Sequence, residues 1–254
     1  MTHRIALWQG PSPAGDVADA VATATRMIAA AGAAGAKVLV LPETWLQGYN
    51  QDTLPETALP RDGNWTAALA TACAAANCAV VIGYAERDGA KVYNAALALD
   101  AAGKQIAHYR KIQLYGPREA ALYTPGDSYS VFDLNGIRTA LLICYDIEFA
   151  PHVATLAARG VRLILVPTAN MLPFTHVAAA TVPAMAANHG LSIAYANYCG
   201  TEDNLTYAGG SVIAGPHGEV LAQAGPTPTL LIADLPAADP TRLSTQAKDY
   251  RAIR

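Results

Sequence analysis

Cys144 stands out because an apolar run leads directly into it and two carboxylates follow it. The stretch reads LLICYDIEFAP, and the acids behind the thiol are Asp146 and Glu148. A cysteine thiol attacks carbonyl carbons once a base or a nearby cation favours the thiolate. A free cysteine at the end of an apolar strand is also an ordinary core residue. This stretch alone therefore leaves both interpretations of Cys144 open.

Glu43 is a candidate for the base. It ends the run KVLVLPE, from Lys37 to Glu43, whose continuous apolar residues predict a buried strand. Functional sites collect at the carboxyl ends of strands in α/β sheets. A carboxylate partly removed from water there has a raised pKa and can act as a base near neutral pH. The alternative is an exposed acid at the start of a loop.

Two more charged residues lie between these stretches. Lys111, in HYRKIQLYG, precedes apolar residues and could present its ammonium to a developing oxyanion. The alternative is an exposed lysine whose stem covers apolar surface. If the segment is extended, Arg110 points the opposite way. Glu119 precedes a Pro-Gly turn, and on its own it is interpreted as an acid in a surface loop.

Other kinds of site have little support in the sequence. The histidines show no HxH or HExxH spacing, and GxSxG, GxxxxGK[ST] and GxGxxG are all missing. Cys73 and Cys78 lie in the Ala-rich stretch TAALATACAAANC, where core packing is favoured over zinc binding. A dyad of Cys144 with His152 stays open. We expect no metal and no cofactor.

Composition narrows the class of protein. Of the 254 residues, 52% are hydrophobic and 15% are charged, which favours a compact fold over disorder. The net charge of −3, without a basic stripe, argues against nucleic acid as a partner. MTHRIALWQG lacks the features of a signal peptide, and no apolar run reaches the length of a membrane span. We expect a cytoplasmic protein with reduced cysteines and no membrane contact.

The elements that must position these residues alternate between strands and helices. Helices are predicted over Asp16–Ala34, with Asp16 as N-cap, and over Asn64–Ala76. A hairpin is predicted to turn at Asp100–Lys104, with Gly103 as the turn residue.

The second half of the chain repeats the order of the first. VRLILVPTAN is similar to KVLVLPETW, LSIAYANYC to AVVIGYAE, and GSVIAGPHGEVLAQA to NAALALDAAGKQIAHY. We therefore predict one α/β domain over residues 1–254, a four-layer αββα sandwich of two mixed sheets with internal pseudo-duplication. The polar tail from about residue 237 lacks a strand pattern and could pack on a partner subunit.

Taken together, these stretches resemble the nitrilase superfamily of carbon–nitrogen hydrolases. Its pattern is a glutamate after an apolar strand, a lysine after a hairpin and a cysteine after a third strand. Here they read LPETWLQGY around Glu43, YRKIQL around Lys111 and CYDIEF at Cys144, and Glu119 before a Pro-Gly turn is also typical. The order, the spacing and the duplicated layout agree along nearly the whole chain. The resemblance identifies Cys144 as a nucleophile.

The resemblance implies a role for each residue. Cys144 attacks the carbonyl carbon of an amide, and Glu43 takes the thiol proton and returns it to the leaving amine. Lys111 and the backbone N–H of Tyr145 hold the oxyanion, and Lys111 also favours the thiolate. Glu43 then activates the water that hydrolyses the acyl-thioester. Glu119 orients Lys111 or that water.

The residues around the cysteine narrow the branch. Tyr145-Asp146 follows it where true nitrilases usually have Trp-Glu, which is similar to the amidase and carbamoyl-hydrolase branches. CYDIEF, PTANM and ANYCG look most like bacterial amidases of small amides, including stereoselective ones. Candidates for contacting the substrate are Tyr145, Tyr49, Glu148 and Asn170.

The expected activity is hydrolysis of a small carboxamide to a carboxylic acid and ammonia, in a homodimer or larger assembly. Hydrolysis of N-carbamoyl amines or an ω-amidase activity is the alternative within the superfamily. A metal-dependent phosphoesterase with the same layers would need a late Asp-His pair, and the sequence contains no Asp-His dipeptide. An inactive scaffold is disfavoured because all four candidate catalytic residues are retained.

Overall fold

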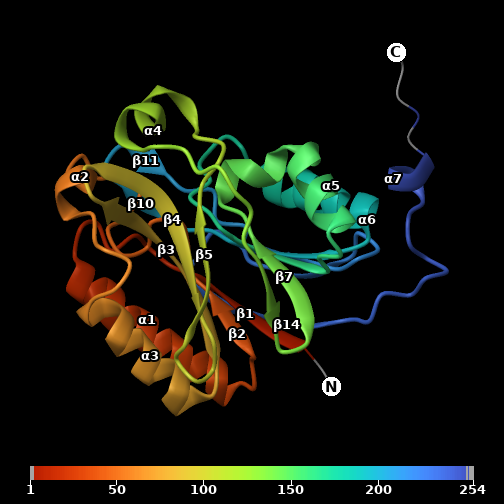
Figure 1. Ribbon diagram of the computed structural model, residues 1–254, viewed down its shortest axis with the longest axis horizontal. Helices are drawn as coiled ribbons and strands as arrows, with labels where there is room; N and C mark the ends of the chain where they lie inside the picture. The colour runs from red at the N-terminus through yellow and green to blue at the C-terminus, as the bar shows by residue number, and fades with distance from the viewer. Residues whose placement is uncertain (1–2, 250, 252–254) are drawn as a thin grey trace.

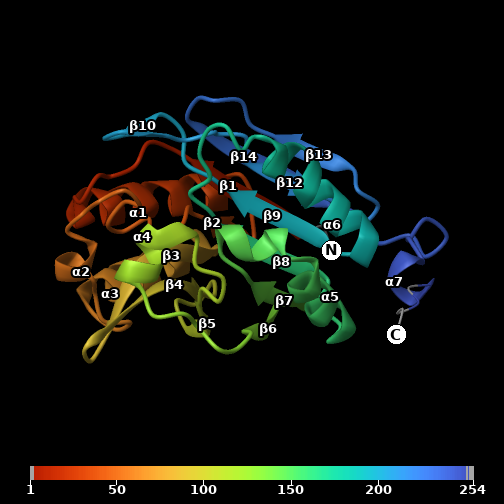
Figure 2. The same ribbon diagram turned by 90° about the horizontal axis from the view of Figure 1, so that it is seen from above.

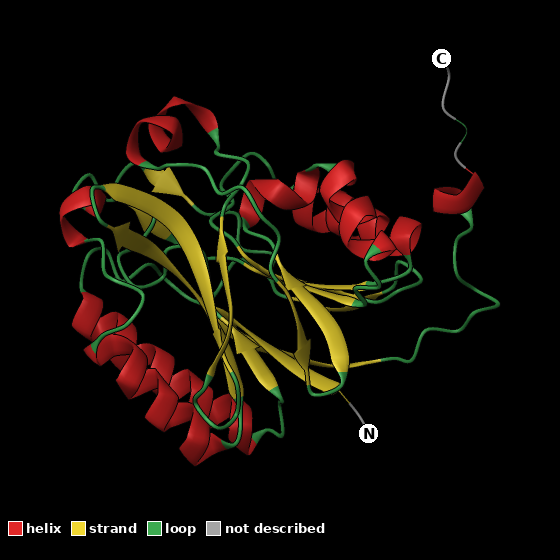
Figure 3. Cartoon of the chain, in the orientation of Figure 1, coloured by secondary structure: helices red, strands yellow, loops and turns green. Residues whose placement is uncertain are grey.

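Two six-stranded sheets pack face to face in this computed structural model, with helices on both outer faces (Figure 1; Figure 3). The structure describes residues 3–249 and 251. The first sheet has the order β14 (Thr229–Leu235), β1 (His3–Gln9), β2 (Val38–Val40), β3 (Ala79–Asp88), β4 (Lys91–Leu99) and β5 (Gln105–Arg110). The second has the order β13 (Val220–Gln223), β12 (Val212–Ala214), β9 (Ser192–Ala196), β8 (Leu163–Pro167), β7 (Ile137–Leu141) and β6 (Val131–Leu134). The predicted four-layer sandwich is confirmed.

The two sheets are built alike, which is the predicted duplication. In the first, β1, β2 and β3 are parallel, and β4 and β5 continue antiparallel. In the second, β7, β8 and β9 are parallel, and β12 and β13 continue antiparallel. An antiparallel strand closes the other edge of each sheet, β14 beside β1 and β6 beside β7. Because β14 comes from the far end of the chain, the first sheet joins both ends of the sequence.

Each sheet carries a pair of helices on its outer face (Figure 2). The first pair is α1 (Val17–Ala33) with α3 (Asn64–Ala76), and the second is α5 (Ala150–Ala158) with α6 (Val182–His189). Asp16 caps α1 as predicted, because its carboxylate accepts a hydrogen bond from the Asp19 N–H at 2.9 Å. Shorter elements complete the fold: α2 (Leu54–Thr57), α4 (Gly116–Leu122), β10 (Thr201–Glu202), β11 (Leu205–Thr206), a 3₁₀ helix (Cys144–Glu148) and a π-helical turn (Val177–Thr181).

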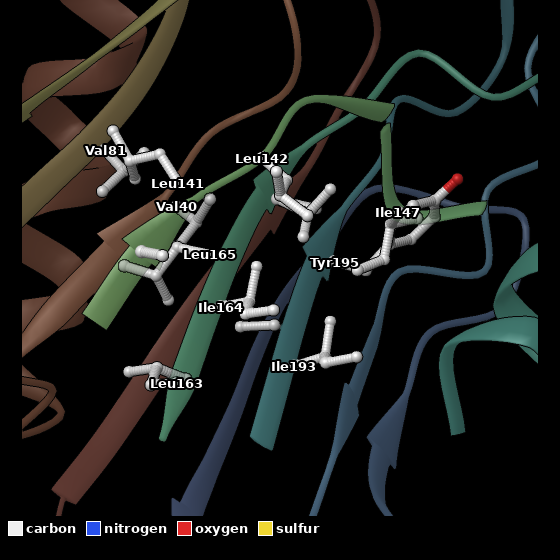
Figure 4. Packing of buried hydrophobic residues seen from close by; sticks show 14 of the residues in the cluster. Val40, Val81, Leu141, Leu142, Ile147, Leu163, Ile164, Leu165, Ile193 and Tyr195 are labelled. Atoms are coloured by element: carbon white, nitrogen blue, oxygen red, sulfur yellow. The ribbon is translucent and has the colours of Figure 1, made fainter. Parts of the chain in front are cut away.

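Strand β2 shows why a continuous apolar run suits this fold. Val38 and Val40 belong to the core between the sheets, whereas Leu39 and Leu41 belong to the core beneath α1 and α3. Figure 4 shows Val40 within the inter-sheet core, together with labelled residues of the second sheet. The strand is shorter than the predicted run from Lys37 to Glu43. The run leaves the sheet early because the Glu43 N–H bonds to Thr168 of the second half.

The tail after β14 extends beyond the sandwich and forms a short helix, α7 (Gln246–Asp249), beside α6 (Figure 1). Residues 250 and 252–254, which belong to the predicted tail, lie outside the described residues. A contact between this tail and a partner subunit stays a prediction. Within the described chain, none of the helices is both long and apolar enough to cross a membrane.

Candidate active site

Three charged side chains predicted from distant parts of the sequence meet in the interior. Glu43 lies just after β2, Lys111 just after β5 and Glu119 in α4. The Lys111 Nζ donates hydrogen bonds to Glu43 Oε1 at 2.6 Å and to Glu119 Oε1 at 2.8 Å. All three residues are at most 1% exposed, so they are neither surface acids nor a surface lysine. The interpretations of Glu43 as a desolvated carboxylate and of Lys111 as a residue near the core agree with this burial, and Glu119 is buried as well.

Glu43 keeps one carboxylate oxygen without a donor. Its Oε1 accepts hydrogen bonds from Lys111 and, at 2.7 Å, from Asn94 Nδ2. Its Oε2 is buried, and no residue in the described part of the chain donates a hydrogen bond to it. Burial raises the pKa of Glu43, although the Lys111 ammonium opposes the shift. A carboxylate with a raised pKa and a free acceptor oxygen is suited to take up a proton.

Glu119 is fully occupied by donors. Its Oε1 also accepts a hydrogen bond from the Tyr49 hydroxyl at 2.7 Å, and its Oε2 accepts one from the Tyr115 N–H at 2.9 Å. For Lys111, burial disfavours the charge, but the carboxylates of Glu43 and Glu119 outweigh burial and raise its pKa. The lysine therefore carries a fixed positive charge between two acids.

Cys144 opens the 3₁₀ helix with a φ of 45°, in the left-handed region that residues with a side chain rarely adopt. Strained backbone of this kind is concentrated at functional sites. The strand that leads to the thiol, β7, ends three residues earlier at Leu141. The sharp turn that follows leaves Cys144 partly exposed.

The surroundings of the Cys144 thiol favour its protonated form. Burial and the Glu43 carboxylate raise its pKa well above the ordinary value, and the Lys111 ammonium offsets them only in part. The Lys111 ammonium does favour the thiolate, but two carboxylates already pair with this ammonium, and its effect is outweighed. Any nucleophilic attack by Cys144 needs a base to remove its proton.

A pocket of about 240 Å³ opens onto Cys144. Its walls are formed by Tyr49, Tyr115, Tyr145, Glu148, Asn170, Met171, Phe174 and His176. The four residues proposed from the sequence to contact substrate are among them. A larger cleft of about 740 Å³ runs past Arg61, Glu86 and Arg110, but none of the four candidate catalytic residues lines it. The smaller pocket, which contains Cys144, is therefore the candidate substrate site.

Residues 4–243 match the family model of carbon-nitrogen hydrolases. The chain belongs to the carbon-nitrogen hydrolase family. Its relatives include a hydrolase encoded in the pqqF 5′ region of Pseudomonas protegens, 40% identical over 92% of this chain and 83% of that protein. An (R)-stereoselective amidase of a Pseudomonas species is 32% identical over 85% of this chain and 78% of that protein.

A solved structure agrees with these relatives. It is a cysteine-to-alanine variant of the amidase from Nesterenkonia sp. AN1 in complex with butyramide. It superposes with a TM-score of 0.87 and 33% sequence identity over 98% of this chain and 94% of that one. The resemblance predicted from the sequence, to the amidase-type branch of the nitrilase superfamily, is confirmed. This carbon-nitrogen hydrolase therefore acts on carbon–nitrogen bonds other than peptide bonds.

Several pocket residues of this carbon-nitrogen hydrolase were not found from its sequence: Tyr115, Met171, Phe174 and His176. Tyr115 directly follows the motif YRKIQL, Met171 is the last residue of PTANM, and Phe174 and His176 follow PTANM closely. Nearness to the motifs is the only signal that could have found them. Phe174, at 37% exposure, is one of the few large apolar side chains on the surface, and its edge faces the Tyr115 ring.

The two acids behind the nucleophile have different surroundings. Glu148 lies on the pocket wall, and burial raises its pKa while His176 and Lys111 oppose the shift. A structural ion pair of Glu148 with Arg159 or Arg162 would be an alternative to a role in the pocket, but neither pair is formed within residues 3–249. Asp146, in contrast, is fully buried and does not line the pocket.

Neither a Cys-His dyad nor a metal site is formed by the described residues. Both ring nitrogens of His152 have other partners, Gln113 Nε2 at 3.1 Å and the Tyr129 hydroxyl at 2.6 Å. The open alternative of a dyad with Cys144 is therefore wrong. No group of three or more His, Cys, Asp or Glu residues within 3–249 is arranged to hold a metal ion.

Proposed function

We propose that this carbon-nitrogen hydrolase converts small carboxamides to carboxylic acids and ammonia through an acyl-thioester on Cys144. The observation that carries the proposal is the unpartnered Oε2 of Glu43, close enough to Cys144 for the carboxylate to raise the pKa of the thiol. The protonated thiol needs a base, and Glu43 is the one carboxylate of the cluster with a free acceptor oxygen among the described residues.

The first half-reaction forms the thioester. Cys144 Sγ bonds to the amide carbon while Glu43 accepts the thiol proton. Lys111 Nζ and the Tyr145 N–H, in the first turn of the 3₁₀ helix, stabilise the oxyanion. Glu43 then gives its proton to the amide nitrogen as the carbon–nitrogen bond breaks, and ammonia leaves.

The second half-reaction releases the acid. Water attacks the thioester carbon, and Glu43 removes a proton from that water. The carbon–sulfur bond breaks, and the proton returns from Glu43 to Cys144 Sγ. Glu119 contacts none of the reacting atoms in this scheme. It keeps Lys111 charged and in place through its own hydrogen bond at 2.8 Å.

The size and charge of the pocket favour short acyl groups that are neutral or carry an amine, over acyl groups that carry a carboxylate. A volume of about 240 Å³ suits a small amide, and the related amidase of known structure binds butyramide. An ω-amidase substrate carries a carboxylate, which would meet the like charge of Glu148 on the wall. We therefore favour the small-amide activity over the ω-amidase activity. Tyr49, Tyr145 and Asn170 are the proposed neutral contacts.

Ammonia release tests the proposal directly. Purified protein is incubated with butyramide, an N-carbamoyl amine and a nitrile, beside the Cys144→Ala variant. We expect ammonia from butyramide, little from the nitrile, and none from the variant, which loses the nucleophile and little volume. Release from the N-carbamoyl amine alone would move the substrate to that class. An active Cys144→Ala variant would remove Cys144 as the nucleophile.

A further inference from the structure

Asp146 lies two residues after the nucleophile and is fully buried. Its carboxylate accepts three hydrogen bonds and leaves neither oxygen free. Oδ1 accepts one from the Gln113 N–H at 2.7 Å. Oδ2 accepts one from the Ile143 N–H at 3.0 Å and one from the Tyr109 hydroxyl at 2.8 Å. Three donors offset much of the cost of burying a carboxylate.

The positions of these donors relative to the active site are informative. Ile143 directly precedes Cys144, so its N–H fixes the start of the nucleophile turn. Tyr109 and Gln113 lie two residues before and two residues after Lys111. One carboxylate therefore joins the turn that carries the thiol to both sides of the segment that carries the ammonium.

Strand pairing does not fix the distance between these two segments. Lys111 follows β5 at the edge of the first sheet, whereas Cys144 follows β7 of the second sheet. The turn at Cys144 also has a strained backbone, with a φ of 45°, that surrounding contacts must hold in place. The hydrogen bonds of Asp146 supply contacts of this kind from both sheets.

We propose that Asp146 is a positioning residue that sets the separation between Lys111 Nζ and the Cys144–Tyr145 turn. The inference rests on the proposed function, in which Lys111 and the Tyr145 N–H hold the same oxyanion. It predicts that weakening the contacts of Asp146 impairs the transition state more than substrate binding, since the pocket walls formed by Tyr49, Asn170 and Phe174 belong to other segments.

The test compares kinetics of Asp146→Asn and Tyr109→Phe with wild type on butyramide, well below the melting temperature of each protein. The asparagine amide nitrogen must face either the Gln113 N–H or the Ile143 N–H, so one of the two segments shifts relative to the other. We expect kcat to fall about 100-fold with KM little changed, as for a misplacement near 1 Å. Tyr109→Phe removes a single donor and should lower kcat less, again with little change in KM.

Tyr129→Phe is the matched control. It also loses a hydroxyl hydrogen bond, to His152, but has none to Asp146. It should keep the kcat of wild type. A folded Asp146→Asn variant with wild-type kcat, or with a raised KM alone, would overturn the proposal. If that variant does not fold, Tyr109→Phe decides in the same way: a wild-type kcat overturns the proposal, and a lowered kcat supports it.

Failure of the proposed function would look different. In that case the wild-type protein itself would release no ammonia from butyramide, or Cys144→Ala would remain active. A wild-type enzyme that depends on Cys144, with Asp146→Asn and Tyr109→Phe both unaffected, would overturn only the role of Asp146.

Discussion

Glu43 and Glu119 bind the same ammonium but differ in their other contacts, and the difference suggests different roles. Glu119 accepts hydrogen bonds from Lys111, Tyr49 and a backbone N–H, so both of its oxygens are engaged. Glu43 retains a buried oxygen with no donor among residues 3–249. Two carboxylates in one site can thus have separate tasks set by their surroundings. Under the proposed function, Glu43 is the base and Glu119 anchors Lys111.

The raised pKa of Glu43 predicts where activity declines in acid. Burial raises this pKa above the ordinary value of 4.5, so Glu43 gains its proton at a higher pH than an exposed glutamate. Because the base must be ionised, kcat/KM should fall as pH decreases through the raised value. The measurement is a pH profile of kcat/KM on butyramide, corrected for stability. A profile that stays flat down to pH 4.5 would contradict this assignment.

Glu148 predicts selectivity by substrate charge. Its carboxylate on the pocket wall should attract an ammonium and repel a carboxylate. We expect a higher kcat/KM for an amino-acid amide than for succinamic acid, and a smaller ratio in Glu148→Gln. Butyramide is the neutral reference, and its kcat/KM should change little in the variant. A preference for succinamic acid, or an unchanged ratio in Glu148→Gln, would end this interpretation.

Single residues were predictable from the sequence when they belonged to a motif. Cys144, Glu43, Lys111 and Glu119 occupy recognisable positions beside strands and turns. The contacts of Asp146 were not predictable, because two of its hydrogen-bond partners, Gln113 and Tyr109, lie more than thirty residues away in the sequence. Sequence spacing gives no register between separate sheets, so such a contact only becomes visible in three dimensions.

Among the secondary-structure elements, strand β5 positions Lys111, which directly follows it. The side chains at the end of the strand alternate as predicted. Lys111 points into the site, and Arg110 points to the other face and pairs with Glu86 of β3 at 2.8 Å. The same Glu86 oxygen lies 2.9 Å from His108 Nε2. Because β4 separates β3 from β5, these contacts span three strands and hold the edge strand in place.

Glu86→Gln should destabilise the protein near neutral pH. Although burial opposes it, hydrogen bonding to His108 and Arg110 lowers the pKa of Glu86 from 4.5 to about 2, which corresponds to up to about 3 kcal/mol. A lowered folded-state pKa means that this stabilisation is fully present above about pH 4.5 and is lost as pH falls toward 2. Urea unfolding of wild type and variant, at pH 7 and below pH 4.5, measures the difference.

Asp88→Asn is the control for Glu86→Gln. Asp88 also pairs with Arg110, at 2.7 Å, but its side chain is 60% exposed, and exposed pairs contribute little. We expect a change within about 1 kcal/mol at either pH. An equal loss in both variants, or a loss in Glu86→Gln that persists unchanged in acid, would show that the buried pair is not the cause.

The whole molecule consists of two similar halves whose strand ends face a common site. The order of strands and helices in each half could be predicted from apolar runs and turn residues, because these are local signals. The pairing of β14 with β1 could not, since it joins residues more than two hundred positions apart. The early end of β2 had a similar cause, the contact between Glu43 and Thr168.

The outer helices of the second sheet bear on the predicted association of whole molecules into a homo-oligomer. Helices α5 and α6 lie on the outside of the second sheet, directly after the 3₁₀ helix that begins at Cys144 and after the π-helical turn. The resemblance to the superfamily implies that subunits pack near these helices. We expect a homodimer or larger assembly. Light scattering at micromolar concentration should give at least twice the chain mass of 26.4 kDa. A single 26.4 kDa species would contradict the prediction.

The proposed mechanism depends on an acyl-thioester on Cys144, and single-turnover mass spectrometry can detect this intermediate. Enzyme in excess over butyramide is quenched in acid at successive times and digested. We expect a butyryl group to appear on the Cys144 peptide and then to disappear. No butyryl group should form on Cys73, Cys78 or Cys199, or in the Cys144→Ala variant. Consumption of butyramide without an acyl group on Cys144 at any time, or by the folded Cys144→Ala variant, would contradict the proposed mechanism.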